Sequence, residues 1–107
     1  MPKIGIPVVK KEDKPRISEH FGKAKWVVLY DTELGSKAFF RNSGLNGKAV
    51  VEIMKTNQCT DAIFASIGQG ATNHLHNAEI HGWYSDAIED VESLIEKLSC
   101  NELRPLR

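Results

Sequence analysis

Cysteine is scarce in this 107-residue sequence: Cys59 and Cys100 are the only two, and they stand far apart. The spacing excludes the C-x-x-C pairs of structural zinc sites and dithiol redox sites, so we expect two free thiols in a reducing compartment. The sequence also lacks an apolar run near the ~18 residues of a membrane-spanning helix, and its N-terminus lacks a secretory leader pattern. These absences favour a soluble, cytoplasmic protein without a membrane partner.

Net charge is absent as well, because 14 Lys and Arg residues balance 14 Asp and Glu residues. This balance argues against a nucleic-acid partner, whose binding would depend on phosphate neutralisation. The charges are nevertheless unevenly distributed: basic residues exceed acidic ones in residues 1–25, whereas residues 79–96 contain six acidic residues and neither Lys nor Arg. The N-terminal excess either favours an anionic ligand or forms an ordinary solvated surface.

Length and hydrophobic pattern predict one α/β domain spanning residues 1–107. Apolar runs of strand length occupy residues 3–9, 26–30, 36–41, 61–65 and 80–84. Helical spacing recurs in residues 49–57, 71–78 and 88–98. The predicted order is therefore β-β-β-α-β-α-β-α, with a mixed five-stranded sheet in which the N-terminal hairpin adds one antiparallel strand.

The last helix carries a capping signal ahead of its apolar stripe. Ser85 or Asp86 is the expected N-cap, and Glu89 follows Asp86 at the spacing of a capping box. The sequence therefore predicts that this helix begins directly after the fifth strand.

An unusual loop, Ser-Glu-His-Phe-Gly at residues 18–22 and called the His20 loop below, lies between the first two predicted strands. The charged segment before it, residues 10–17, contains Pro15 and shows no periodicity, which predicts an exposed loop. Binding groups are often displayed on loops held by a rigid sheet. His20 is therefore a candidate ligand-binding residue.

A second candidate segment, called the glycine turn below, is Ser-Ile-Gly-Gln-Gly at residues 66–70, which follows the fourth strand and opens the second helix. Free amides at a helix N-terminus can bind an anion, although glycines can also serve a tight turn. The segment matches neither G-x-G-x-x-G nor a phosphate-binding loop with its lysine. If the first and fourth strands are parallel neighbours, this turn and the His20 loop lie at the same edge of the sheet.

Several segments, taken in order, resemble the dinitrogenase iron-molybdenum cofactor biosynthesis family, which includes NifX-like proteins and the C-terminal domain of NifB. They are Lys-Ile-x-Ile-Pro-Val in the first strand, Ser-Glu-His-Phe-Gly-Lys-Ala in the loop, and Ile-Gly-x-Gly-Ala before the second helix. The resemblance spans nearly the whole chain. It implies a ribonuclease-H-like, three-layer fold and a non-enzymatic carrier or scaffold for an iron–sulfur or molybdenum-containing cluster.

The resemblance also implies the site. By matching position, His20 corresponds to the family's metal-contacting histidine, Phe21 and Gly22 shape its loop, and residues 68–71 correspond to the opposite lip of the site. Imidazole is a competent iron ligand, and backbone amides with nearby cations can offset the negative charge of a cluster. A single histidine suits transient binding between cluster donor and acceptor proteins, by a monomer or weak dimer. The predicted site residues are Arg16, His20, Phe21, Gly22, Lys23, Gly68, Gln69, Gly70 and Ala71.

A zinc or other metal site built from His20, His74, His76 and His81 is an alternative. His74 and His76 are two positions apart on a predicted helix, so their side chains diverge by about 200° and are poorly placed to share one ion. We therefore expect surface or capping roles for both.

Two other function classes remain open. A ribonuclease-H-like hydrolase would need clustered carboxylates, but only Asp31 and Asp61 stand near strand ends, and no nucleophile–base arrangement is evident. No catalytic residue is therefore predicted. A protein-interaction or regulatory module would instead use the aromatic residues as core or dimer contacts. These aromatics are Trp26, Trp83, Phe39 and Phe40.

Overall fold

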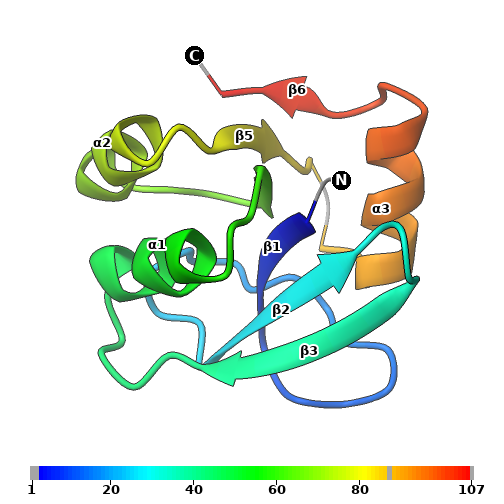
Figure 1. Cartoon of the computed structure of the whole chain (residues 1–107), viewed down its shortest axis with the longest axis horizontal. Helices are drawn as coiled ribbons and strands as arrows, with labels where there is room; N and C mark the ends of the chain where they lie inside the picture. Colours follow the sequence, from blue (N-terminus) through cyan, green and yellow to red (C-terminus); the bar gives the residue numbers. More distant parts are fainter. Residues whose placement is uncertain (1–2, 87, 107) are drawn as a thin grey trace.

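An open six-stranded sheet separates two helical layers in the computed structural model, which describes residues 3–86 and 88–106 (Figure 1). Its strands lie in the order β3-β2-β1-β4-β5-β6. Strands β1, β4 and β5 are parallel, β2 is antiparallel to both of its neighbours, and β6 is antiparallel to β5. The strands are β1 (Lys3–Val8), β2 (Trp26–Asp31), β3 (Ser36–Arg41), β4 (Asp61–Phe64), β5 (His81–Tyr84) and β6 (Arg104–Pro105).

The predicted mixed α/β sheet is confirmed, but the prediction of five strands is wrong. The additional strand, β6, contains only two residues, too few to show hydrophobic alternation. Tertiary contacts hold it at the edge of the sheet: the Leu106 amide donates to the Gly82 carbonyl at 2.8 Å, and Leu106 packs close to the Gly82 backbone.

Three helices cover the two faces of the sheet (Figure 1). Helices α1 (Gly47–Thr56) and α2 (Gln69–Asn77) pack on one face, and α3 (Val91–Ser99) packs on the other. Alternation along β1 follows this division, because Ile4, Ile6 and Val8 face α3 while Gly5 faces α1. A Cβ on Gly5 would lie 2.7 Å from Cγ of Met54, so the glycine allows α1 to approach the sheet closely.

Each face of the sheet has its own hydrophobic core. The core under α1 and α2 includes Phe21, Val27, Leu29, Val50, Val51, Met54, Cys59, Ala62, Phe64, Leu75 and Ile80. The core under α3 includes Ile4, Ile6, Val8, Ile17, Val28, Ile63, Val91, Leu94 and Leu103. The four aromatics named above are partly buried against these cores, in agreement with core packing: Phe40 on the first, and Trp26, Phe39 and Trp83 on the second. Both cysteines are free thiols, as expected, Cys59 buried and Cys100 exposed.

The predicted start of α3 is wrong, because its N-cap is Asp90. The Asp90 carboxylate accepts the Ser93 amide at 2.9 Å, and this hydrogen bond is the main cause that lowers the pKa of Asp90. Glu89 and Asp90 lie outside the helix because this stretch pairs with the segment before the His20 loop: the Ile17 amide donates to the Glu89 carbonyl, and the Val91 amide, at the first position of α3, donates to the Pro15 carbonyl.

The segment at residues 10–17 is exposed through residue 14, as expected, but Pro15 and Ile17 are buried. Strand β4 pairs with β1 only at Ile4 and Gly5, and further along β1 the Pro7 carbonyl accepts the Ser18 amide at 2.8 Å. The chain therefore returns beside β1 and enters the His20 loop at the carboxyl end of the parallel strands.

None of the helices within the described ranges is long and apolar enough to cross a membrane.

Candidate functional site

A cavity of about 610 Å³ lies where the His20 loop meets the N-terminal turns of α1 and α2. Because β1 and β4 are parallel neighbours, the two candidate segments do lie at one edge of the sheet. The structure brings together most of the predicted site residues as cavity lining: His20, Phe21, Gly22, Lys23, Gly68, Gly70 and Ala71.

Two predicted site residues, Arg16 and Gln69, do not line the cavity. The backbone of Arg16 pairs with Val9 and Asp90, which places this residue beside the start of α3. The Gln69 side chain donates to Oδ1 of Asn73 at 3.1 Å, along the exposed surface of α2. Both residues are close in sequence to the His20 loop or the glycine turn, but the fold places neither of them in the cavity lining.

The sequence prediction missed one wall of the cavity, which the start of α1 supplies. Asn46 is a recognisable N-cap signal, but nothing local indicates that this helix end faces the His20 loop. The lining residues that were not predicted are Leu45, Asn46, Gly47, Lys48, Ser66 and His74.

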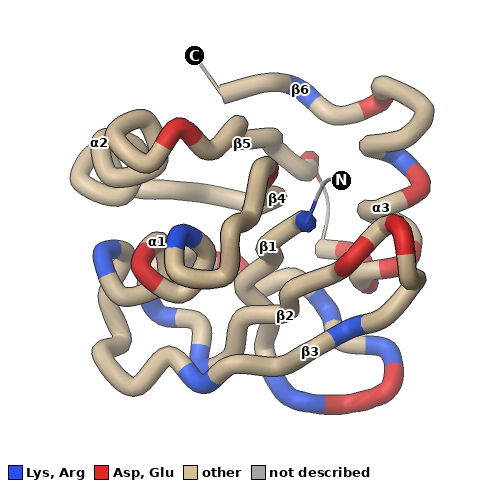
Figure 2. Tube along the Cα trace, in the orientation of Figure 1, with Lys and Arg blue, Asp and Glu red and all other residues tan. Residues whose placement is uncertain are grey.

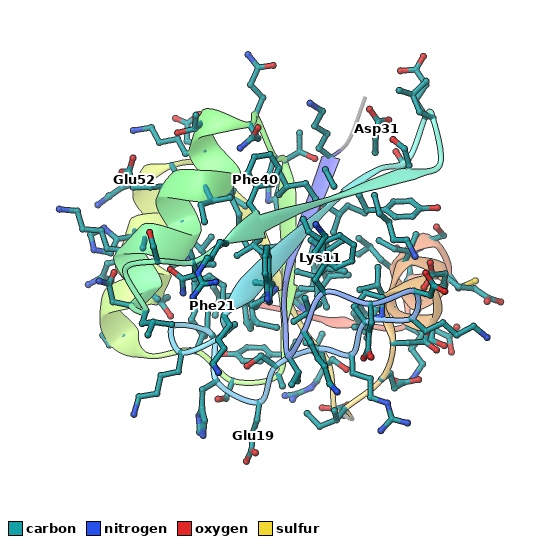
Figure 3. The ribbon with its side chains drawn as sticks, turned by 90° about the horizontal axis from the view of Figure 1, so that it is seen from below. Lys11, Glu19, Phe21, Asp31, Phe40 and Glu52 are labelled. Carbon is teal, nitrogen blue, oxygen red and sulfur yellow. The ribbon has the colours of Figure 1, made fainter. Side chains whose placement is uncertain are left out.

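Hydrogen bonds fix the backbone of the His20 loop against the glycine turn. Ser66 makes two of them: its hydroxyl donates to the Glu19 carbonyl at 2.9 Å, and its carbonyl accepts the Phe21 amide at 3.2 Å. The Ser18 hydroxyl also donates to the His20 carbonyl at 3.0 Å. The Glu19 side chain extends outward from the loop, as Figure 3 shows. The His20 side chain is exposed, so a held backbone presents an accessible imidazole.

Phe21 anchors the same loop through the hydrophobic core. Its buried ring packs edge-to-face on Phe64 with centroids 5.7 Å apart, and Phe64 packs in the same way on Tyr84. Truncation of a buried phenylalanine costs about 3–5 kcal/mol. The aromatic ring that follows His20 therefore contributes mainly to positioning the loop.

The loop between β3 and α1 also holds the His20 loop. Buried Asn42 donates from Nδ2 to the carbonyls of Gly22, at 3.2 Å, and Ala24, at 2.8 Å. Three residues later Leu45 has φ of 49°, which is unfavourable for a side chain of this kind, and it is 54% exposed at the cavity. This short loop thus combines a fixed end at Asn42 with a strained apolar lip at Leu45.

Close backbone packing brings the two helix N-termini together. A Cβ on Gly22 would lie 2.7 Å from the Gly47 nitrogen, and a Cβ on Gly47 would lie 2.6 Å from Cβ of Ala71. Both distances are well below ordinary contact. Gly22 and Gly47 are therefore needed for the His20 loop, the start of α1 and the first turn of α2 to pack against one another.

Gly68 and Gly70 differ from these packing glycines. A Cβ on either would contact nothing within 4 Å, and neither residue has a positive φ. Neither steric crowding nor backbone conformation thus requires glycine here, which weakens the tight-turn explanation. The two glycines leave the backbone of the first turn of α2 uncovered at the cavity.

The cavity is electrostatically suited to an anion. Gly68, the N-cap of α2, provides no side-chain acceptor for the first-turn amides, and the N-terminus of α1 faces the same cavity. Lys23 and Lys48 are the charged residues of its lining, which contains no Asp or Glu among the described residues. Figure 2 shows the wider pattern, with acidic residues prominent around α3, on the other side of the sheet from α1 and α2.

Cys59 lies outside this cavity lining, in the core under α1 and α2. Burial raises the pKa of its thiol to about 11, with a further increase from Asp61 and an opposing effect of Lys3. The thiol is therefore protonated at neutral pH and is a poor metal ligand.

The two carboxylates considered for a hydrolase lie at the amino ends of the parallel strands, opposite the cavity, where Asp31 pairs with Lys3 and Asp61 pairs with Ile4. Each has local partners: Asp31 accepts the amides of Glu33 and Leu34, and Asp61 accepts the Trp83 indole at 2.9 Å. Over the part of the chain that the structure describes, no cluster of three or more His, Cys, Asp or Glu could hold a metal ion.

Comparisons with known proteins agree with the resemblance noted in the sequence. The family model described as dinitrogenase iron-molybdenum cofactor matches residues 3–101. A candidate NifB protein from Thermotoga superposes with a TM-score of 0.87 at 24% identity, covering 99% of this chain and 94% of its own. The apo form of the orange protein from Desulfovibrio gigas also gives 0.87, at 14% identity, with coverage of 100% and 98%. A comparison with curated protein sequences finds no match.

Proposed function

Because its family model spans residues 3–101, this chain belongs to the dinitrogenase iron-molybdenum cofactor family, and we propose that it binds and carries an anionic metal–sulfur cluster in the cavity beside His20. Membership connects the protein with the biosynthesis or handling of that cofactor. The cluster is the cargo of the protein in this proposal and can be of the iron–sulfur or the iron–molybdenum type.

One observation carries the proposal: an accessible imidazole opens into a cavity whose only charged lining residues, among those described, are lysines. Neutral imidazole can ligate iron, and sulfide-rich clusters are commonly anionic. Lys23, Lys48 and two helix N-termini would offset that charge without forming covalent bonds.

The shape of the cavity supports the same proposal. Its volume of about 610 Å³ falls within the usual 300–1,000 Å³ of small-molecule sites. The bare backbone at Gly68 and Gly70 allows a cluster to approach the amides of α2 closely. A site with so few ligating side chains favours release, as transfer between donor and acceptor proteins requires.

The proposed role is non-enzymatic. The carboxylates Asp31 and Asp61 lie at the edge of the sheet opposite the cavity, and their oxygens accept local hydrogen bonds. The proposal includes cytoplasmic location, a monomer or weak dimer, and classification of the fold as ribonuclease-H-like.

Anaerobic titration of the apo-protein with a synthetic [4Fe–4S] cluster, and separately with a molybdenum–sulfur cluster, tests the proposal. The wild type should take up one of them stoichiometrically, and His20→Ala should reduce its affinity on the order of 10²-fold. His81→Ala is the matched control, because His81 is exposed at the start of β5 and does not line the cavity.

Negligible uptake of both clusters by the wild type would refute the carrier function. Chemical-shift changes induced by a partner protein under those conditions would then favour an interaction module. Metal-dependent cleavage of nucleic acid that is lost in Asp31→Asn would favour a hydrolase.

A further inference from the structure

His74 occupies the cavity from the side of α2. It follows Gly70 by four residues and Ala71 by three, so the three lie on neighbouring positions of one helix face. All three line the cavity together with His20, which comes from the loop after β1. The expected surface position is correct for exposed His76, whereas His74 is half-buried and faces the candidate site.

The imidazole of His74 is available to a ligand. Across the described residues, its side chain forms no hydrogen bond within 3.5 Å and no ion pair within 4 Å. His74 also lines a smaller cavity of about 80 Å³ between α1 and α2, beside Lys48, Glu52 and Lys55. The ring nitrogens of this half-buried residue are not among the buried, unpartnered polar atoms of the described residues, so a ligand in the cavity can reach them.

We propose that His74 is a second ligand of the metal–sulfur cargo, so that the cluster is held between imidazoles from two separate segments. This inference rests on the proposed carrier function and extends it to the binding mode. The cargo must then expose two metal sites open to nitrogen donors.

Two donors on a rigid framework bind more tightly than one. After the first imidazole binds, the second acts at an effective concentration set by the framework, which strengthens binding by about 10²–10⁴-fold. The Ser66 hydrogen bonds hold His20, and α2 holds His74, so little ordering is needed. Release then proceeds through a state with one imidazole bound, in which an acceptor protein can take the vacated metal position.

Pulsed EPR on protein labelled with ¹⁵N-histidine tests this binding mode. Wild type, His74→Ala, His74→Gln and His76→Ala are each loaded anaerobically with the synthetic [4Fe–4S] cluster and reduced. We expect two coupled histidine nitrogens in the wild type and in His76→Ala, but one in either His74 variant. The affinity of both His74 variants should fall by about 10²–10⁴-fold, the gain that the second imidazole supplies. Thermal unfolding checks that both variants remain folded.

The outcomes separate this inference from the function on which it rests. No uptake by the wild type would refute both. Uptake that depends on His20, with a single nitrogen coupling and unchanged affinity in the His74 variants, would overturn the second ligand while leaving the carrier function intact. The His74→Gln variant keeps the inference testable if His74→Ala fails to fold.

Discussion

Replacing Gly47 with alanine should destabilise the protein by forcing apart the N-termini of α1 and α2. The new Cβ would lie 2.6 Å from Cβ of Ala71, about 1 Å inside the ordinary carbon–carbon contact of 3.5–4.0 Å. Overpacking of this kind costs about 1–3 kcal/mol. The loss is measurable, because a domain of this size has a total stability of about 5–15 kcal/mol.

The structure also predicts a rescue by Ala71→Gly. Once the methyl group of Ala71 is removed, the nearest neighbours of the new Cβ are Cα of Ala71 at 3.5 Å and Cδ1 of Phe21 at 3.8 Å, both ordinary contacts. Ala71→Gly alone should cost about 0.5–1 kcal/mol, because glycine is unfavourable within a helix. The double variant should therefore be more stable than Gly47→Ala, even though it contains a second destabilising change.

Urea unfolding of the wild type, both single variants and the double variant forms a double-mutant cycle. We expect a coupling free energy of about 1–2 kcal/mol in favour of the double variant. Cluster uptake should follow the same order, because the separation of the helices changes the cavity. Additivity of the two substitutions within about 0.5 kcal/mol would refute the close contact between the helix ends and the role assigned to Gly47.

Three further predictions concern other parts of the molecule. Gly70→Ala should maintain stability or raise it by about 0.5–1 kcal/mol in urea unfolding, while weakening cluster uptake; a loss of stability would contradict the open space around Gly70. Ser66→Ala should cost about 0.5–1.5 kcal/mol and weaken uptake, because the hydrogen bond to Glu19 is lost; unchanged uptake would show that this bond does not position His20. The Cys59 pKa rises from 9.0 unfolded to about 11 folded, so its stabilising contribution is complete below pH 9 and is lost as the pH rises through 11. The stability difference between wild type and Cys59→Ala should therefore shrink from pH 8 to pH 11, by at most ~2.7 kcal/mol, and a constant difference would contradict the raised pKa.

The sequence by itself determined the first five strands, the three helices and two of the three walls of the cavity. Alternation of apolar residues at period two and at helical spacing reports which face of each element is buried, and this information is local. The His20 loop and the glycine turn were recognisable because both follow strands, and the carboxyl ends of parallel neighbours meet at one edge.

Only the tertiary structure decided what meets these two segments. The third wall depends on Gly22 packing against Gly47 and on Gly47 packing against Ala71, contacts between residues far apart in the sequence. Long-range contacts also keep Arg16 out of the cavity lining, because its backbone pairs near the start of α3. They likewise place His74 in the lining, because the way α2 lies on the sheet decides which of its faces meets the cavity. Local patterns specify which side of a segment is buried, whereas long-range packing specifies its neighbours, and the neighbours make this site.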